Sequence, residues 1–238
     1  MKLEPLSGLI SLFYPPSCAV CECATAPGQY LCSTCEKRAL RIVPPFCEKC
    51  SESFPGAIDG SFVCPNCSHR RLYFDAAVSA YRSRGVVRFV MLRFKYNRQL
   101  HLRHLIGQWL RRALEDDRLR ERSFDFLVPV PLHPARRRER GFNQAELLAG
   151  GLSHDARLPV RHALERIRYT TTQTALDRAE RMENLRDAFR LRSAVDVRNS
   201  RVLLVDDILT TGSTLSECAR VLRRGGAASV CAITAARA

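Results

Sequence analysis

The hydrophobic pattern of the chain changes character near residue 70. Before that point, apolar residues follow no helical or strand period, and prolines interrupt the segment at Pro15, Pro16, Pro44, Pro45, Pro55 and Pro65. Turns and short strands are therefore expected there. After that point, short apolar runs alternate with segments in which apolar residues recur every three or four positions. This alternation predicts an α/β domain whose parallel sheet is flanked by helices.

The second region contains several candidate strands and helices. Strands are predicted at residues 75–81, 126–130, 202–205 and 230–234. Helices are predicted at residues 86–96, 100–114, 144–152 and 214–224, the last of them ended by Gly225 and Gly226. The run 202–205 is wholly apolar, as in a parallel strand that is buried on both faces. A polar stretch at 170–192 is expected to contain a helix at 178–185.

Apolar residues also occur near the N-terminus, at positions 3–13, but Glu4 interrupts them and Lys2 is the basic residue in front of them. This pattern predicts a short helix that packs on the body of the protein instead of a signal peptide. No apolar run reaches the length of about 18 residues that a membrane-spanning helix needs. We therefore expect a cytoplasmic protein with no membrane insertion.

Cysteines are concentrated in the first region, where they form four Cys-x-x-Cys pairs. The pairs are Cys18 and Cys21, Cys32 and Cys35, Cys47 and Cys50, and Cys64 and Cys67. Two such turns supply four thiolates, which is a closed tetrahedral shell for structural Zn²⁺. We predict a small domain at residues 1–70 with two structural zinc ions, because a segment with so few large apolar side chains needs metal to fold. Sequential and cross-braced pairings both fit the spacing, and Cys23 is a spare that can replace Cys21.

The net charge of +14 is confined to the second region. Residues 1–70 carry six basic and six acidic side chains, whereas residues 71–238 carry 32 basic and 18 acidic ones. A positive field of this size favours a polyanionic partner, either a nucleic acid or a phosphorylated metabolite. Only four of the 38 basic residues are lysines, so an arginine-rich composition with many solvated surface arginines is the alternative explanation.

Residues 202–214 combine an apolar strand, two carboxylates and a turn rich in hydroxyl groups. Asp206 and Asp207 follow the strand, at the edge where ligands bind in open α/β sheets. Gly212 lets the backbone approach a phosphate closely, and the amides of the turn and the next helix form an anion nest. The carboxylates accept hydrogen bonds from a diol, such as the hydroxyls of ribose. The residues predicted to bind the ligand are Val205, Asp206, Asp207, Thr210, Thr211, Gly212, Ser213 and Thr214.

This segment resembles the 5-phosphoribosyl-1-pyrophosphate (PRPP) signature of type I phosphoribosyltransferases. The resemblance implies that residues 71–238 form a domain of this kind and bind PRPP with Mg²⁺, which bridges the pyrophosphate and the ribose hydroxyls. It also implies a second loop for the pyrophosphate, followed here by arginines suited to bidentate phosphate contact, and a hood that closes over the site. A solvated basic turn is the alternative for these arginines. The residues predicted for the pyrophosphate loop and hood are Leu132, His133, Arg136, Arg140, Arg166 and Gln173.

Taken together, the two regions resemble the ComF family of competence-associated proteins, which join a double zinc ribbon to a phosphoribosyltransferase domain. The match runs from about Pro16 to Arg237. It includes the cysteine pairs, residues 94–96, 129–132, 140–144 and 206–214, and Arg166, Gln173, Leu176, Arg181, Asn184 and Phe189. The resemblance implies a cytoplasmic role in natural transformation, with single-stranded DNA and a translocase helicase as partners. Cys23 and Ser51 depart from the family pattern beside the cysteine pairs.

Two functions stay open at this level. As an enzyme, the chain would displace pyrophosphate at ribose C1, and the catalytic residues Asp206 and Asp207 would orient the ribose and support the developing positive charge. The alternative is a non-catalytic competence factor that binds single-stranded DNA and whose ligand loop is regulatory or vestigial. Aromatic side chains that would then offer stacking faces are Tyr81, Phe94, Tyr96 and Trp109.

Overall fold

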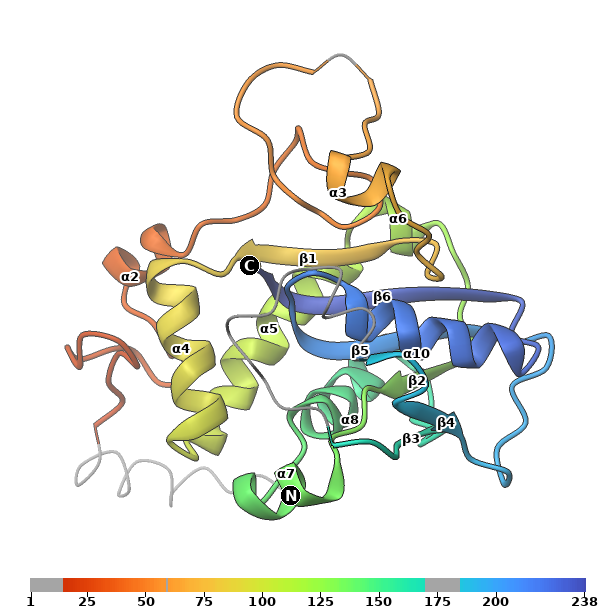
Figure 1. Ribbon diagram of the computed structural model, residues 1–238. Coiled ribbons are helices and arrows are strands. Elements are labelled where there is room, and N and C mark those ends of the chain that lie inside the picture. Colours follow the sequence, from red (N-terminus) through yellow and green to blue (C-terminus); the bar gives the residue numbers. More distant parts are fainter. Residues whose placement is uncertain (1–14, 59, 170–184) are drawn as a thin grey trace.

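The apolar runs of the second region form one sheet at the centre of the molecule (Figure 1). The computed structural model describes residues 15–58, 60–169 and 185–238. The strands of the sheet are β1 (Ala77–Arg82), β2 (Phe126–Pro129), β5 (Arg201–Leu209) and β6 (Ser229–Arg237). Their order is β1-β6-β5-β2, and each pair of neighbours is parallel. The predicted parallel sheet is confirmed.

Different helices cover the two faces of this sheet. Helices α5 (Arg103–Leu114) and α8 (Gln144–Ala156) pack on one face, and α10 (Ser213–Arg224) packs on the other. Successive side chains of a strand point to opposite faces. Accordingly, Leu203 of β5 is buried in the core with α5 and α8, whereas Leu204 is buried in the core with α10. Burial on both faces explains why residues 202–205 are all apolar.

Shorter elements connect and flank the sheet. Helix α4 (Gly85–Tyr96) follows β1, and the 3-10 turn η1 (Leu100–Leu102) leads into α5. The others are α6 (Asp117–Arg120), α7 (Pro134–Arg140) and the antiparallel pair β3 (Leu164–Arg166) and β4 (Phe189–Leu191). The pair β3–β4 forms a separate two-stranded sheet, and β4 contacts α10.

The cysteine-rich segment contains little regular structure and lies along the β1 side of the sheet (Figure 1). Among its described residues, the helices are the short α2 (Ser33–Arg38) and α3 (Pro65–Ser68). Backbone hydrogen bonds join it to β1: the Ile42 amide donates to the Ala80 carbonyl at 2.9 Å, and the Arg82 amide donates to the Leu40 carbonyl at 2.8 Å. These bonds cover the outer edge of β1, which would otherwise expose unpaired backbone groups.

Strand and helix positions agree with the predictions to within a few residues, with one change that matters for function. Strand β5 continues to Leu209, so Asp206 and Asp207 lie within the strand and not after it. Their inclusion follows from pairing with β6, where Asp206 is opposite Thr234. Helix α7 was not among the helices predicted from the sequence. None of its residues is buried, so no apolar period marks it. The helices expected near the N-terminus and at 178–185 lie outside, or almost wholly outside, the described residues.

Within residues 15–58, 60–169 and 185–238, no helix combines the length and the apolar character that a bilayer span requires.

Candidate functional site

Two adjacent carboxylates lie near the carboxyl end of β5. Asp207 is 4% exposed and forms an ion pair with Lys95, whose Nζ lies 3.0 Å from Oδ2 of Asp207. The backbone amide of Asp207 donates a hydrogen bond of 2.8 Å to Oδ1 of Asp206. Lys95 belongs to the last turn of α4, so this ion pair joins α4 to the acidic end of β5.

The surroundings of Asp206 shift its ionisation strongly. Burial raises the pKa of Asp206 to about 7, and repulsion from the Asp207 carboxylate acts in the same direction. The charges of Lys95 and Arg166 and the Asp207 amide oppose this rise, because positive charge and hydrogen-bond donors favour the carboxylate form. Near neutral pH, Asp206 is therefore partly protonated, whereas an ordinary surface aspartate would stay ionised.

The turn between β5 and α10 has a defined conformation. Gly212 has φ 78° and ψ 1°, a left-handed conformation, and it is the N-cap of α10. Glycine adopts this conformation without the steric cost that a side chain adds. The hydroxyl oxygens of Thr211 and Ser213 lie 2.9 Å apart, and the Ser213 amide donates to Thr211 Oγ1 at 3.4 Å. A hydroxyl-rich turn that leads into a 12-residue helix is suited to hold an anion.

Residues 70–74, which follow the last cysteine pair, pack against this turn. The guanidinium of Arg70 donates a hydrogen bond to the backbone carbonyl of Thr211. The ring of Phe74 and the guanidinium of Arg70 approach the position that a Cβ would take at Gly212, at 3.6 and 3.7 Å. The backbone amide of Tyr73 donates to Ser216 Oγ at 3.2 Å. The turn is thus supported from outside its own βα unit.

Cationic side chains gather beside the carboxylates. A cavity of about 150 Å³ between α4 and α7 is lined by Lys95, Tyr96, Arg98, Arg136, Glu139 and Arg140. The guanidinium of Arg140 lies 5.3 Å from the centre of the Tyr96 ring, and Tyr96 is 65% exposed. Because Lys95 both lines this cavity and pairs with Asp207, the cavity adjoins the acidic end of β5. We call it the basic pocket.

The other residues predicted for the pyrophosphate loop and hood lie as follows. Leu132 and His133 follow β2, and Nδ1 of His133 accepts a hydrogen bond of 3.2 Å from the Ala135 amide at the start of α7. The pKa of Arg166 on β3 is lowered from its ordinary value, mainly by burial. The positive charge of Arg136 acts in the same direction, and the negative charge of Asp206 opposes it. Arg166 is therefore within electrostatic range of both Asp206 and Arg136. Gln173 lies outside the described residues.

Lys95 and Arg70 are residues of this site that were not among the predicted ones. Lys95 lies in the segment 94–96 that carries part of the family resemblance, which is the signal that could have identified it. Arg70 precedes the loop that it contacts by 141 positions, and nothing in the local sequence indicates this contact.

The eight paired cysteines form two groups of four. One group is Cys18, Cys21, Cys32 and Cys35, and the other is Cys47, Cys50, Cys64 and Cys67, and in each group the sulfurs lie within 4.8 Å of one another. The pairing is thus sequential. A tetrahedral Zn²⁺ with Zn–S bonds of about 2.3 Å separates its sulfurs by about 3.8 Å. Cys21 and Cys32 are 3.6 Å apart, and Cys50 and Cys64 are 3.7 Å apart. Both groups fit a structural zinc ion.

The two positions that depart from the family pattern have different surroundings. The sulfur of Cys23 is 3.4 Å from that of Cys21, so Cys23 is a fifth sulfur next to the first group. Ser51 is fully buried with φ 58°, a left-handed conformation that glycine adopts more easily. Its hydroxyl donates to the Ala77 carbonyl at 3.0 Å, an interaction that a glycine could not make.

Comparison with known proteins agrees with this arrangement. The family model described as a double zinc ribbon domain matches residues 9–68, and the one described as a phosphoribosyl transferase domain matches residues 140–238. The fold and the two cysteine groups therefore define a protein with a phosphoribosyltransferase-type domain behind a double zinc ribbon.

Relatives that are similar over most of the chain identify its family more closely. Competence protein F of Haemophilus influenzae is 32% identical over 200 residues, covering 82% of this chain and 85% of that protein. DNA utilization protein YhgH of Salmonella typhimurium is 31% identical over 231 residues, covering 92% and 96%. A solved purine phosphoribosyltransferase from Pyrococcus horikoshii aligns with a TM-score of 0.36 and 16% identity, over 56% of this chain and 83% of that one. The first two relatives, each more than 30% identical over more than two thirds of both chains, show that the chain belongs to the ComF family.

Proposed function

We propose that the acidic end of β5 and the turn after it bind PRPP together with Mg²⁺, and that the domain transfers the phosphoribosyl group to an acceptor. The observation that carries this proposal is the combination of three features on adjoining elements. They are the Asp206–Asp207 pair, the hydroxyl-rich turn at the N-terminus of α10, and the cations that lie beside them. Carboxylates suit a diol, whereas the turn and the cations suit phosphate groups.

Each part of PRPP has a corresponding group of side chains in this proposal. The 5-phosphate binds to the turn, and the ribose hydroxyls donate hydrogen bonds to Asp206 and Asp207. The pyrophosphate extends toward the loop after β2 and the arginines on α7 and β3. The residues assigned to these roles are Val205, Asp206, Asp207, Thr210, Thr211, Gly212, Ser213 and Thr214, with Leu132, His133, Arg136, Arg140, Arg166 and Gln173 around the pyrophosphate.

The proposed reaction is a substitution at ribose C1. The bond between C1 and the pyrophosphate oxygen breaks, a bond from C1 to the acceptor forms, and the acceptor loses a proton. Asp206 and Asp207 stabilise the positive charge that develops on the ribose, and the arginines stabilise the departing pyrophosphate. Mg²⁺, when bound with the substrate, supplies further neutralisation of the pyrophosphate charge.

We further propose that residues 1–70 and 71–238 act together in DNA handling during competence, in the cytoplasm. The names of the relatives support this role, since one is a competence protein and the other a DNA utilization protein. Single-stranded DNA and a translocase helicase are the partners that fit such a role.

The second candidate function is non-catalytic binding of single-stranded DNA. The basic pocket favours it, because the exposed Tyr96 ring next to Arg140 combines a stacking face with positive charge. In this case the PRPP loop is regulatory or vestigial.

Calorimetric titration of the purified protein with PRPP and Mg²⁺, followed by measurement of pyrophosphate release, distinguishes the two functions. Saturable binding that is lost in the double variant Asp206→Asn, Asp207→Asn is expected for a transferase and for a regulatory loop, and retained binding in that variant contradicts the site. No binding by the wild-type protein leaves a vestigial loop. Release that depends on an added base or on single-stranded DNA establishes a transferase. Binding with no release from any acceptor leaves the non-catalytic function.

A further inference from the structure

The two cysteine groups differ in how they are connected to the ligand site. In the first group, Cys21 is exposed and Cys32 is half-buried. In the second group all four cysteines are at most 7% exposed, and they belong to the same core as Phe74 and the α10 residue Leu215. Cys18 and Cys35 of the first group are also buried, in the core that contains Val205 of β5. The two groups therefore differ in solvent exposure and in the residues that connect them to the turn, and not in core burial alone.

The first connection from the second group to the loop runs along the chain itself. Arg70 stands three residues after Cys67 and donates its hydrogen bond to the Thr211 carbonyl. Phe74 contacts the Gly212 position at 3.6 Å, and the Tyr73 amide donates to Ser216. Residues 70–74 therefore contact the turn at its middle and again within the first turn of α10.

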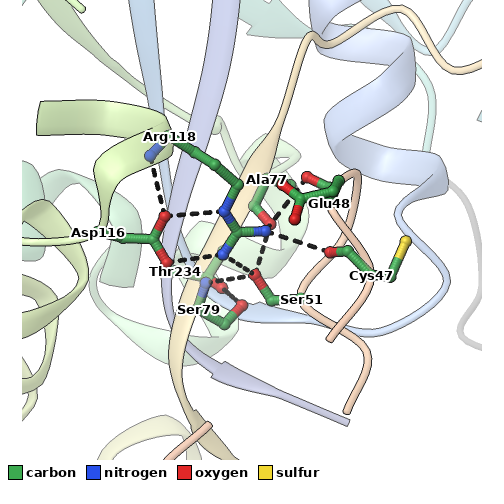
Figure 2. A network of polar contacts seen from close by, with 8 residues as sticks. All are labelled: Cys47, Glu48, Ser51, Ala77, Ser79, Asp116, Arg118 and Thr234. Carbon is green, nitrogen blue, oxygen red and sulfur yellow. Dashed lines mark hydrogen bonds and ion pairs between the residues drawn. The ribbon is translucent and has the colours of Figure 1, made fainter. Parts of the chain in front are cut away.

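A second connection runs through buried hydroxyls (Figure 2). The hydroxyl of Ser51, next to Cys50, accepts a hydrogen bond of 3.2 Å from the Ser79 amide on β1. The Ser79 and Thr234 hydroxyl oxygens lie 2.6 Å apart, and Thr234 is the residue opposite Asp206 in the sheet. This series of contacts leads from the third cysteine pair to the strand position beside the acidic pair.

Arg118 fixes the cysteine end of that connection, as Figure 2 also shows. Its guanidinium donates to the backbone carbonyls of Cys47 and Glu48 at 3.2 and 3.1 Å, and to Ser51 Oγ at 3.0 Å. Asp116 holds the same guanidinium with a 2.7 Å ion pair. The turn of the third cysteine pair is thus attached to α6 of the larger domain.

We propose that the second cysteine group is the support of the ligand loop, with Arg70 as the positioning residue that transmits its geometry to Thr211 and Gly212. That this loop binds PRPP rests on the proposed function. Without metal, a segment of this kind loses its fold, and Arg70 then loses its fixed position. By linkage, ligand bound in the loop must stabilise the metal in the second group to the same degree. The first group has no such effect on the loop.

The decisive variants are Arg70→Ala, Arg70→Lys and the control Arg71→Ala. Arg71 is exposed and lies over the Tyr73 ring at 5.1 Å, so its removal changes the local charge equally but spares the bond to Thr211. We expect Arg70→Ala to weaken PRPP binding about tenfold, because a loop without this bond would hold its binding conformation for only about a tenth of the time. Arg70→Lys should restore most of the affinity, Arg71→Ala should change it less than twofold, and each variant should keep its zinc content.

Hydrogen exchange at residues 210–216, measured without ligand, separates this inference from the proposed function. Faster exchange in Arg70→Ala than in Arg71→Ala supports the positioning role even if the wild-type protein fails to bind PRPP, in which case the proposed function alone is wrong. If the wild type binds PRPP but Arg70→Ala changes neither affinity nor exchange, the inference is overturned and the proposed function stands.

Release of zinc from the wild-type protein into a chelating indicator tests the reciprocal effect without any variant. We expect saturating PRPP with Mg²⁺ to slow the release of one of two zinc equivalents and leave the other unchanged. Equal slowing of both equivalents, or slowing of neither by ligand that calorimetry shows to be bound, contradicts the coupling.

Discussion

Two carboxylates in consecutive positions repel each other, and burial strengthens the repulsion because the surroundings screen charge less than water does. Lys95 lies 3.0 Å from Asp207 and so compensates Asp207 directly, but Asp206 only at longer range. Burial is the main cause of the rise of the Asp206 pKa to about 7, repulsion from Asp207 adds to it, and the charge of Lys95 offsets only part of it. A ligand that places charge beside Asp206 can therefore change its protonation state near neutral pH.

The first prediction concerns the stability of the unliganded protein as a function of pH. The pKa of Asp206 is raised from 3.8 to about 7 by folding, so the neutral carboxyl stabilises the folded state below about pH 4. That contribution falls as the pH rises toward 7, because the unfolded state releases its proton first. Asp206→Asn stays neutral, and its free energy of unfolding should lack a decline on the order of 3 kcal/mol across this range.

Urea unfolding of wild type and Asp206→Asn at a series of pH values measures this difference. Asp196→Asn is a suitable control, because Asp196 has its pKa lowered to about 2 by Arg198 and should show no matching effect between pH 4 and pH 7. Parallel stability curves for wild type and Asp206→Asn would disprove the raised pKa.

The second prediction concerns the ion pair between Lys95 and Asp207. Lys95→Met removes the cation and leaves the carboxylate, which is 6% exposed, without its partner. We expect a loss of about 2 kcal/mol in the free energy of unfolding, less than for a fully buried pair because the Lys95 side chain is 18% exposed. Adding Asp207→Asn should recover part of this loss, since no buried charge then lacks its partner. Additive effects in the double-mutant cycle would contradict the pairing.

At the scale of elements, the sequence predicts a strand, turn or helix best where all the residues that define it are contiguous in the chain. Strand β5, its turn and α10 are such a case, because an apolar run, Gly212 and the apolar period of the helix are contiguous. Contacts between distant segments leave no local signal. Lys95 reaches the acidic pair from α4, and Arg70 reaches the turn from the end of the cysteine-rich segment. The turn could therefore be predicted from its own segment, whereas the contact from Arg70 could not, and the family resemblance of residues 94–96 was the signal for Lys95.

The third prediction tests the turn itself through Gly212→Ala. The added Cβ would meet neighbouring atoms at 3.5 Å or more, so space is adequate, but φ of +78° is unfavourable for alanine. We expect a loss of about 1 kcal/mol in stability from backbone strain. Gly107→Ala is the matched control: Gly107 lies inside α5 with nothing within 4 Å of the Cβ position, and the change should stabilise the protein by about 1 kcal/mol. Chemical denaturation measures both, and equal effects of one sign would refute the argument from the turn.

At the scale of the whole molecule, structural and electrostatic roles fall in different parts of the chain. Residues 1–70 are neutral and provide the two cysteine groups, whereas residues 71–238 hold the entire charge of +14. The basic pocket and the acidic pair are contiguous through Lys95. A phosphorylated small molecule and a polyanionic chain can therefore meet at one place on the molecule, which relates the two proposed functions to each other.

The last prediction follows from this distribution of charge and concerns single-stranded DNA. Binding through the basic pocket should weaken steeply with salt, because each phosphate neutralised by an arginine releases counterions. The double variant Arg136→Gln, Arg140→Gln should lower the slope of log affinity against log salt by about 1.4, the value for two contacts to a single strand. Lys37→Gln with Arg38→Gln removes the same charge from two exposed positions of α2, and this control should leave the slope nearly unchanged. Fluorescence anisotropy over a range of salt concentrations gives all three slopes.

Equal slopes for the two double variants would mean that binding of single-stranded DNA responds to net charge and not to the basic pocket. A wild-type affinity for single-stranded DNA that does not depend on salt would remove the electrostatic argument for DNA altogether.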